Sequence, residues 1–166
     1  LKQHQNINVS IGFFWNAGDF DIRHEIARAD ERMYIEKQEY YGFAHNRFWK
    51  IMHTVFDMPI NSYEQKKEIL YKHQILLWDV IGECEREGSL DSAIRKEKVN
   101  DLTQLIHTYP TLRKVICNGR KAHALYCKHF ADITLPCVYL PSTSNANRSL
   151  REDALFEQWR QELQGL

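Results

Sequence analysis

Short apolar runs recur along the chain and are separated by longer amphipathic stretches. The runs are ILLWDV at 75–80, KVICNG at 114–119 and CVYLPS at 137–142, and turn-forming residues bound each of them. Runs of this length are too short for buried helices and are typical of strands that are covered on both faces. We therefore predict three buried strands, together with a fourth near the N-terminus from INVSIGFF at 7–14.

The stretches between these runs have apolar residues at helical spacing, which predicts helices with one buried face. The stripes consist of Phe48, Ile51, Met52, Val55 and Phe56; of Val99, Leu102, Leu105 and Ile106; of Ala122, Leu125 and Tyr126; and of Leu150, Leu155, Trp159 and Leu163. Ser149 and Glu152 have the spacing of a capping box, which predicts that the last helix begins there.

The alternation of buried strands with helices predicts an α/β fold. We expect a three-layer α/β/α sandwich around a mainly parallel sheet of about four strands, in which the three later strands are neighbours. A chain of 166 residues fits one compact domain with a sizeable core.

Composition and charge narrow the range of partners. Hydrophobic residues make up 43% and charged residues 27% of the chain, as is usual for a soluble globular protein. Lys plus Arg and Asp plus Glu both number 22, so there is no overall basic field and any nucleic-acid contact must be local. No apolar run reaches the length of a membrane span, and the N-terminus lacks a signal-peptide pattern. We expect a cytoplasmic monomer with no membrane partner.

The four cysteines are Cys84, Cys117, Cys127 and Cys137, and no two of them form a C-x-x-C pair. Cys117 and Cys137 lie inside apolar runs, where a cysteine usually serves as a small buried hydrophobe. We therefore expect no metal or iron–sulfur site and no structural disulfide.

A polar loop follows the last predicted strand. PSTSNANRS at 141–149 combines hydroxyl, amide and guanidinium groups directly before the last helix. In open α/β sheets, ligands bind beyond the carboxyl ends of the strands, and the N-terminus of a helix favours anions such as phosphate. Composition alone favours a simpler interpretation, in which the Ser and Asn residues make turns and cap helices.

A second polar cluster comes directly before an amphipathic helix, in YYGFAHNRFWKIM at 40–52. A base flipped out of a duplex needs stacking on its faces and hydrogen bonds on its edges, and this cluster offers both. Each residue also has a structural explanation. Asn46 could cap the helix, and Phe48 shares an apolar stripe with Met52.

Together, HNRFWKIM and the later LPSTSNANRS resemble the uracil-DNA glycosylase superfamily, with the hypoxanthine (deoxyinosine) DNA glycosylase branch as the closest match. LLWDVIGECEREGSLDSAI at 76–94 and VICNGRKAHALY at 115–126 are similar to the middle segments of that branch. The resemblance runs from about Tyr40 to the C-terminus and implies one domain of this kind over residues 1–166.

Two departures from the family pattern are visible. Members carry a Gly-x-x-Pro loop after the first strand, whereas residues 1–39 contain no proline and are therefore atypical. Asn145 stands where the branch commonly has a proline in its Ser-Thr-Ser-Pro-Ala-Asn run.

The resemblance implies a DNA repair enzyme that hydrolyses the N-glycosidic bond of a deaminated base, hypoxanthine or uracil, flipped out of DNA. The implied chemistry needs no metal or other cofactor, and the implied partner is DNA that contains a deaminated base. Asn46 matches the catalytic residue of the branch, and Phe48 matches the aromatic that stacks on the base. The implied pocket wall is Tyr40, Tyr41 and His45. The implied DNA contacts are Ser142, Thr143, Ser144, Asn145, Asn147 and Arg148.

A different class of function is also open. The atypical residues 1–39 support a catalytically silent α/β module that binds nucleic acid or a nucleotide. A duplex-cleavage assay separates the two hypotheses, because a binding module would shift labelled DNA without leaving abasic sites.

Overall fold

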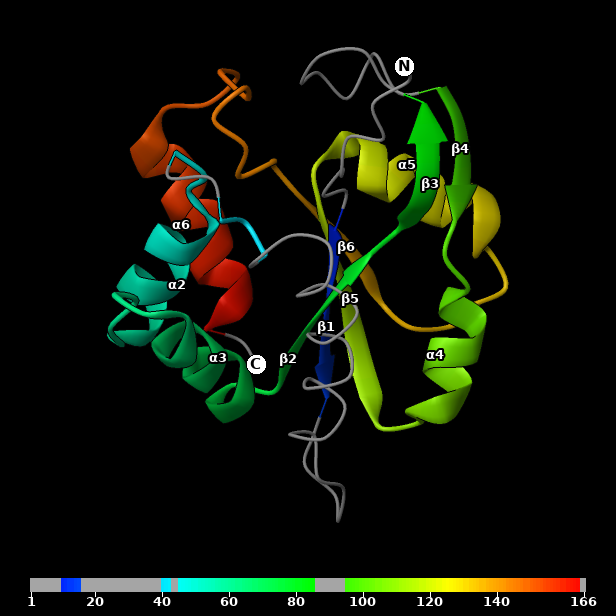
Figure 1. The fold of residues 1–166 in the computed structure, drawn as a ribbon, viewed down its shortest axis with the longest axis horizontal. Coiled ribbons are helices and arrows are strands. Elements are labelled where there is room, and N and C mark those ends of the chain that lie inside the picture. Colours follow the sequence, from blue (N-terminus) through cyan, green and yellow to red (C-terminus); the bar gives the residue numbers. More distant parts are fainter. Residues whose placement is uncertain (1–9, 16–39, 43–44, 86–94, 165–166) are drawn as a thin grey trace.

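The computed structural model describes residues 10–15, 40–42, 45–85 and 95–164 of the chain (Figure 1). Its main sheet contains β1 (Ser10–Trp15), β2 (Ile75–Asp79), β5 (Leu112–Asn118) and β6 (Cys137–Leu140) in the order β2-β1-β5-β6. A second, two-stranded sheet pairs β3 (Ile81–Glu85) with β4 (Arg95–Val99). The helices are α2 (Phe48–Phe56), α3 (Tyr63–Lys72), α4 (Leu102–Thr108), α5 (Arg120–His129) and α6 (Glu152–Leu163).

Helices lie on both sides of the main sheet. In Figure 1 the sheet runs through the middle, with α2, α3 and α6 on one side and α4, α5 and the β3–β4 sheet on the other. The predicted α/β fold is therefore confirmed, and the four predicted strands overlap observed ones, although residues 7–9 of the first lie outside the described residues.

The direction of the strands differs from the prediction of a mainly parallel sheet. β5 and β6 pair in parallel, with Val115 opposite Cys137, whereas β1 pairs antiparallel with both β2 and β5. β1 also separates β2 from β5, so the three later strands are not all neighbours. The prediction of a mainly parallel sheet is wrong because an apolar run indicates burial but does not indicate the direction in which strands pair.

The core lies between the sheet and its helices. On α2, the predicted stripe buries Phe48, Ile51 and Met52, and Trp49 is buried beside it. On α6, a second buried stripe consists of Leu155, Trp159 and Leu163. Cys117 is fully buried in β5, as predicted, and Cys137 on the neighbouring strand is half-buried.

The predicted capping box at the start of α6 is wrong. The helix begins at Glu152 after Arg151, and no side chain caps it. Ser149 instead donates from its hydroxyl to Asn147 Oδ1 at 2.6 Å and from its backbone N–H to the same oxygen at 3.2 Å. Ser149 thus belongs to the turn before the helix, because the hydroxyl and the N–H of Ser149 both donate to Asn147 Oδ1.

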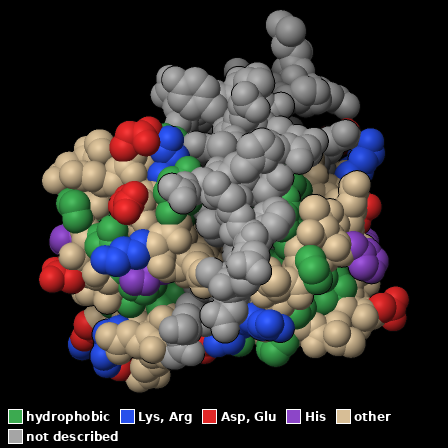
Figure 2. Space-filling model, turned by 90° about the horizontal axis from the view of Figure 1, so that it is seen from below, with side chains coloured by type: hydrophobic (Ala, Val, Ile, Leu, Met, Phe, Trp, Pro, Cys, Tyr) green, Lys and Arg blue, Asp and Glu red, His purple; other side chains and the backbone are tan. Residues whose placement is uncertain are grey.

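Charges of both signs are mixed on the face that Figure 2 shows. On the described part of the face in Figure 2, basic and acidic side chains alternate and no large area has a single sign. Within the described ranges, none of the helices is both long and apolar enough to cross a bilayer. The expected cytoplasmic location and monomeric state stay predictions.

Candidate active site

Arg47 joins the two polar segments that the sequence singled out. Its backbone N–H donates to Thr143 O at 3.0 Å, and its Nη2 donates to Ser144 O at 2.7 Å and to Asn147 O at 3.0 Å. Longer bonds reach Thr143 O from Nε at 3.3 Å and Ser142 O from Nη2 at 3.4 Å. The fork of N–H donors in a guanidinium suits several carbonyl acceptors at once. The segment around Arg47 and the loop at 142–147 therefore lie side by side in the fold.

The meeting point lies at the carboxyl ends of β5 and β6. Asn118, the last residue of β5, accepts from Thr143 N at 2.9 Å and donates from Nδ2 to Thr143 Oγ1 at 2.9 Å. The same Nδ2 donates to the hydroxyl of Tyr41 at 2.9 Å. One carboxamide thus links the end of β5, the loop after β6 and the segment before α2.

Gly119 allows the loop to approach β5 this closely. Its φ is +103°, a conformation that favours glycine, and a Cβ placed there would lie 3.0 Å from the Cβ of Ser142. A larger residue would strain the backbone and push the loop away from Asn118.

Aromatic rings form the floor of the site. The ring of Phe48 stacks on Tyr41 with centroids 4.3 Å apart, and it makes T-shaped pairs with Trp49 and Trp159, whose centroids are 5.0 Å and 6.0 Å away. Phe48 and Tyr41 are both buried, with 3% and 4% of their surface exposed. The predicted stacking residue therefore already has an aromatic ring against its face.

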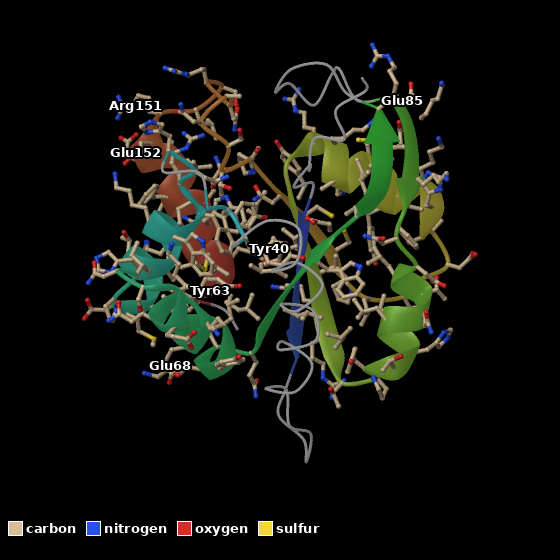
Figure 3. All side chains as sticks on the ribbon, in the orientation of Figure 1. Tyr40, Tyr63, Glu68, Glu85, Arg151 and Glu152 are labelled. Carbon is tan, nitrogen blue, oxygen red and sulfur yellow. The ribbon has the colours of Figure 1, made fainter. Side chains whose placement is uncertain are left out.

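Two indole N–H groups fix the surrounding backbone. Trp49 Nε1 donates to Tyr40 O at 2.7 Å, and Trp159 Nε1 donates to Pro141 O at 3.0 Å. Figure 3 shows Tyr40 beside the sheet, and Arg151 and Glu152 at the outer start of α6. The two tryptophans thus anchor both segments of the site to the helices beneath them.

A small cavity of about 10 Å³ lies under these rings, lined by Tyr41, Phe48 and Asn118 and by apolar side chains of α2, α6 and the sheet. A cavity of this size has room for about one water molecule. It cannot hold a base in this conformation.

Asn46 lies half-buried at the entry to α2. Its Oδ1 accepts from the backbone N–H of Phe48 at 2.9 Å, which is the helix-end contact expected for a structural role. That contact turns the oxygen toward the helix and leaves the amide N–H₂ as the free end of the side chain. Among the described residues, Asn46 Nδ2 has no hydrogen-bond partner. His45, the residue before it, is exposed.

The predicted DNA-contacting residues fall into two groups. Thr143 is fully buried and Asn147 donates from Nδ2 to Ser142 O at 2.8 Å, so both side chains hold the loop together. Their placement differs from that of exposed DNA contacts. Asn145 and Arg148, by contrast, are exposed.

The two serine hydroxyls act as acceptors inside the loop. Ser142 Oγ accepts from Ser144 N at 3.2 Å, and Ser144 Oγ accepts from Ala146 N at 3.3 Å. Each hydroxyl keeps its own proton for an outside acceptor, because a hydroxyl donates once and accepts twice. An incoming phosphate oxygen is an acceptor of that kind.

The cations near the loop differ in their partners. Arg151 pairs with Asp153, and its hydrogen bonds are the main cause that lowers the pKa of that carboxyl to about 2. Lys50 pairs with Glu152 and so joins α2 to α6 at the surface. Within the described ranges Arg148 has no ion pair, so its charge is available to an incoming anion.

Sequence patterns did not assign a role to Arg47, Asn118 or Trp159. Arg47 lies inside the HNRFW stretch and Asn118 ends the apolar run before Gly119. A polar residue followed by glycine at the end of a buried strand was the available signal for Asn118. The partners of all three residues are far away in the sequence, and no local pattern indicates such contacts.

Residues 26–164 match the uracil DNA glycosylase superfamily. The chain is 40% identical over 116 residues to a hypoxanthine DNA glycosylase of Methanosarcina acetivorans, covering 69% of this chain and 73% of that protein. A hypoxanthine DNA glycosylase of Methanosarcina barkeri is 34% identical over 90 residues, 53% of this chain and 57% of its own length. A solution NMR structure from M. acetivorans, described as a uracil DNA glycosylase, is similar with a TM-score of 0.64 at 34% identity, over 81% of this chain and 83% of that one. The chain therefore belongs to the uracil DNA glycosylase superfamily.

Proposed function

We propose that this protein removes hypoxanthine, and uracil as the alternative base, from DNA by hydrolysing the N-glycosidic bond of the flipped-out nucleotide, and that residues 1–166 form one domain of this family. The observation that supports it most is the joining of the Asn46–Phe48 element to the 142–148 loop by Arg47. The names of its relatives support hypoxanthine as the base.

Asn46 is the residue we propose for catalysis. As the bond breaks, the sugar becomes oxocarbenium-like and the leaving base gathers negative charge, so a positioned donor stabilises the transition state. An amide is too weak a base to take a proton from water near neutral pH, but its N–H₂ can donate to the base edge or hold a water in position. The contact of Asn46 Oδ1 with Phe48 N leaves that N–H₂ group for this role.

The base would lie at the carboxyl end of β5, near Phe48 and Asn118. Phe48 matches the aromatic that stacks on the base, and the carboxamide of Asn118 bonds to Tyr41 and Thr143 beside it. A hydrogen-bonding edge is what distinguishes one deaminated base from another. Tyr40 and Tyr41 form the inner wall in this arrangement, and His45 lies at the exposed rim.

The loop would bind the DNA backbone on either side of the flipped nucleotide. The hydroxyls of Ser142 and Ser144 donate to phosphate oxygens, and the exposed guanidinium of Arg148 adds charge. Asn145 is exposed at the tip, where it faces the gap left in the duplex. Thr143 and Asn147 support this loop from inside.

The test is excision from duplexes that contain one deoxyinosine or one deoxyuridine, read as abasic-site cleavage under single-turnover conditions. Asn46→Ala removes both the amide and the helix-end oxygen, whereas Asn46→Ser keeps an oxygen that can cap the helix. If Asn46 is catalytic, both variants lose roughly 10²–10³-fold in rate, by analogy with the loss of one oxyanion donor. If Asn46 is only a cap, the alanine variant loses about 1 kcal/mol of stability. The serine variant then excises like the wild type.

The binding-module alternative makes a different prediction. Wild-type protein that retards labelled duplex but leaves no abasic sites on either substrate, at any protein excess, would favour a catalytically silent module. Excision of one base and not the other identifies the substrate.

A further inference from the structure

The carbonyl groups of the loop after β6 are drawn toward one point. The oxygens of Ser142, Thr143, Ser144 and Asn147 all accept from the side chain of Arg47. The shortest of these bonds joins Nη2 to Ser144 O at 2.7 Å. Arg47 directly precedes α2, so the carbonyls of the loop face the start of that helix.

The N–H group that shares a peptide bond with Ser144 O points the other way. A trans peptide is planar, its C=O and N–H bonds point in opposite directions, and the described residues contain no cis peptide bond. The N–H of Asn145 is therefore directed away from Arg47. Among the described residues this N–H has no hydrogen-bond acceptor, and Asn145 is exposed. The loop thus offers an unpaired backbone donor on the side away from α2.

The charge of Arg47 favours an anion at this donor. Arg47 is half-buried, and within the described ranges it bonds to neutral carbonyl oxygens and to no carboxylate. Its positive charge is therefore not cancelled by a neighbouring negative one and lies directly behind the loop. A backbone N–H binds a charged acceptor such as a phosphate oxygen more strongly than a neutral acceptor.

Asn145 is the second residue of a turn. Ser144 O accepts from Asn147 N at 3.0 Å, which makes Ser144 the first of four turn residues. Proline is favoured at the second position of such turns, and it has no N–H. The related branch commonly has a proline at this place, whereas this chain has an asparagine. The donor is therefore one that a proline would abolish while the turn is kept.

We propose that the backbone N–H of Asn145 binds a phosphate oxygen of DNA, and that Arg47 orients it for this contact by holding the carbonyl of the same peptide bond. The proposal rests on the proposed function and adds to it a donor that belongs to the backbone, which no side-chain motif indicates. The N–H makes the contact, and Arg47 is a positioning residue that acts through the loop.

The first experiment compares Asn145→Pro with Asn145→Ala. Both variants lack the carboxamide of Asn145, and they differ in the backbone N–H. The probe is an undamaged duplex, because its binding does not depend on a flipped base. We expect the proline variant to bind it about tenfold more weakly than the alanine variant, as is usual for the loss of one hydrogen bond to a charged group. Melting temperatures of the two variants confirm that both are folded.

A salt series separates the loss of the donor from a displaced loop. A neutral N–H releases no counterions when it binds phosphate, so its loss should leave the slope of log affinity against log salt unchanged. A proline that displaced the loop would also remove the charged contact of Arg148 and flatten the slope. We therefore expect parallel lines for Asn145→Pro and Asn145→Ala, with the proline line lower at every salt concentration.

The second experiment repeats the comparison in two further backgrounds. Arg47→Lys keeps the charge, but an ammonium group cannot hold several carbonyls at once. If Arg47 orients the N–H of Asn145, the ratio of the alanine to the proline affinity falls toward one in this background, because coupled residues are not additive. Arg151→Lys is the matched control background, in which the ratio is expected to stay near tenfold.

Three results would overturn the proposal. Equal affinities of Asn145→Pro and Asn145→Ala would mean that the N–H makes no contact, and a flattened slope in the proline variant would assign its loss to displacement of the loop. An undiminished ratio in the Arg47→Lys background would remove the positioning role. Failure of the proposed function has a different signature, in which the wild type binds undamaged duplex with the expected ratio but excises neither deoxyinosine nor deoxyuridine.

Discussion

At the scale of single residues, Arg47 is a cation whose side chain donates its hydrogen bonds to backbone carbonyls. Four carbonyl oxygens of the 142–147 loop accept from its side chain, and the residue is half-buried. Because its donors lie in one plane and point outward, a guanidinium can satisfy acceptors spread along a curved loop. An ammonium group is a compact point charge with three donors and cannot span them.

Arg47→Lys is therefore expected to destabilise the protein although the charge is kept. We expect a loss of about 2–3 kcal/mol in the free energy of unfolding, because partly buried carbonyls lose charge-assisted partners. Urea denaturation measures it. Arg151→Lys is the matched control, since Arg151 is exposed and pairs with Asp153, and it should change stability by less than about 0.5 kcal/mol. Equal effects of the two substitutions would mean that Arg47 does not hold the loop.

His73 gives the stability a dependence on pH. Its ring stacks on Phe56 at 3.7 Å, and burial, with Lys72 beside it, lowers its pKa below the ordinary value of 6.5. The folded protein thus prefers the neutral ring, and the unfolded chain binds more protons below pH 6.5. The contribution of His73 is fully present above that pH and is lost as the pH falls toward the folded-state pKa.

His73→Phe keeps a ring against Phe56 and removes the titration. Chemical denaturation between pH 5 and pH 8 should show a smaller loss of stability on acidification than in the wild type. If the stability of His73→Phe depends on pH as steeply as that of the wild type, the pH dependence comes from other groups.

At the scale of elements, the sequence predicts position better than pairing. The runs at 75–80, 114–119 and 137–142 became β2, β5 and β6 because burial on both faces needs continuous apolar residues. The antiparallel direction of β1 and its place between β2 and β5 depend on long-range contacts, which leave no periodic signal. The capping pattern at Ser149 failed for a local reason, since Asn147, two residues earlier, accepts from the N–H of Ser149.

The same distinction applies to the candidate site, where some residues could be predicted from the sequence and others could not. Asn46 and Phe48 could be named from a short motif, because both lie within one turn of the same helix start. Asn118 and its contact with Tyr41 could not, since the two residues are 77 positions apart in the sequence. Motifs thus identify the residues that offer chemistry, and only the fold shows what holds or covers them.

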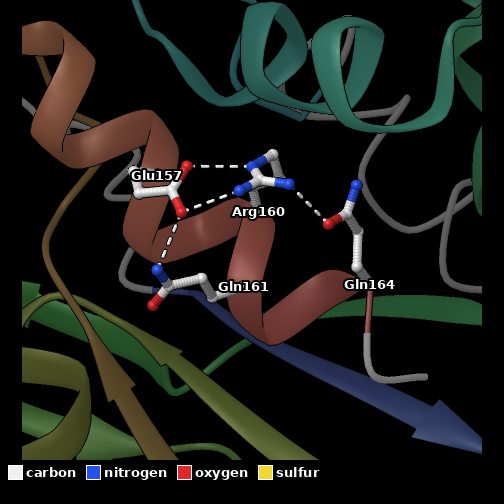
Figure 4. A network of polar contacts seen from close by, with 4 residues as sticks. All are labelled: Glu157, Arg160, Gln161 and Gln164. Carbon is white, nitrogen blue, oxygen red and sulfur yellow. Dashed lines mark hydrogen bonds and ion pairs between the residues drawn. The ribbon is translucent and has the colours of Figure 1, made fainter.

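Helix α6 has two faces that make different contacts. Its outward face carries Glu157, Arg160, Gln161 and Gln164, which bond to one another at 2.7–2.9 Å (Figure 4). Such exposed pairs at helical spacing contribute only a few tenths of a kcal/mol each. The inward face carries Trp159, which touches Phe48 and bonds to the backbone where β6 ends. The inward face therefore connects this helix to the site.

Trp159→Phe should cost about 1–3 kcal/mol, because it leaves the buried carbonyl of Pro141 without its donor. Trp78→Phe is the matched control, since Trp78 Nε1 is buried without a hydrogen-bond partner among the described residues. Removal of an unsatisfied donor is close to neutral or stabilising, apart from the lost ring area. Thermal melts compare the two. A larger loss for Trp78→Phe would show that the bond to Pro141 is not what fixes α6.

At the scale of the whole molecule, attraction to DNA must come from a few local cations. The chain has 22 basic and 22 acidic residues, and Figure 2 shows the two signs mixed on the described part of one face. A protein with this balance lacks the long-range field that speeds association with nucleic acid. Its affinity then depends on how many phosphate contacts the loop after β6 makes, and its salt dependence reports that number.

Arg148→Ala is expected to weaken binding of damaged and undamaged duplexes by the same factor, because phosphate contacts are blind to the base. The slope of log affinity against log salt should flatten by about 0.9 for one lost contact. Arg113→Ala is the matched control. Arg113 is also exposed but lies near the start of β5, at the opposite end of the strand from the site, so its removal should leave the slope unchanged.

Single-turnover excision at saturating protein should fall far less for Arg148→Ala than for Asn46→Ala, since a uniform loss of binding is recovered by concentration. Parallel salt lines for wild type and Arg148→Ala, with equal affinity and equal melting temperature, would mean that this arginine makes no phosphate contact and that the serine hydroxyls hold the strand without it.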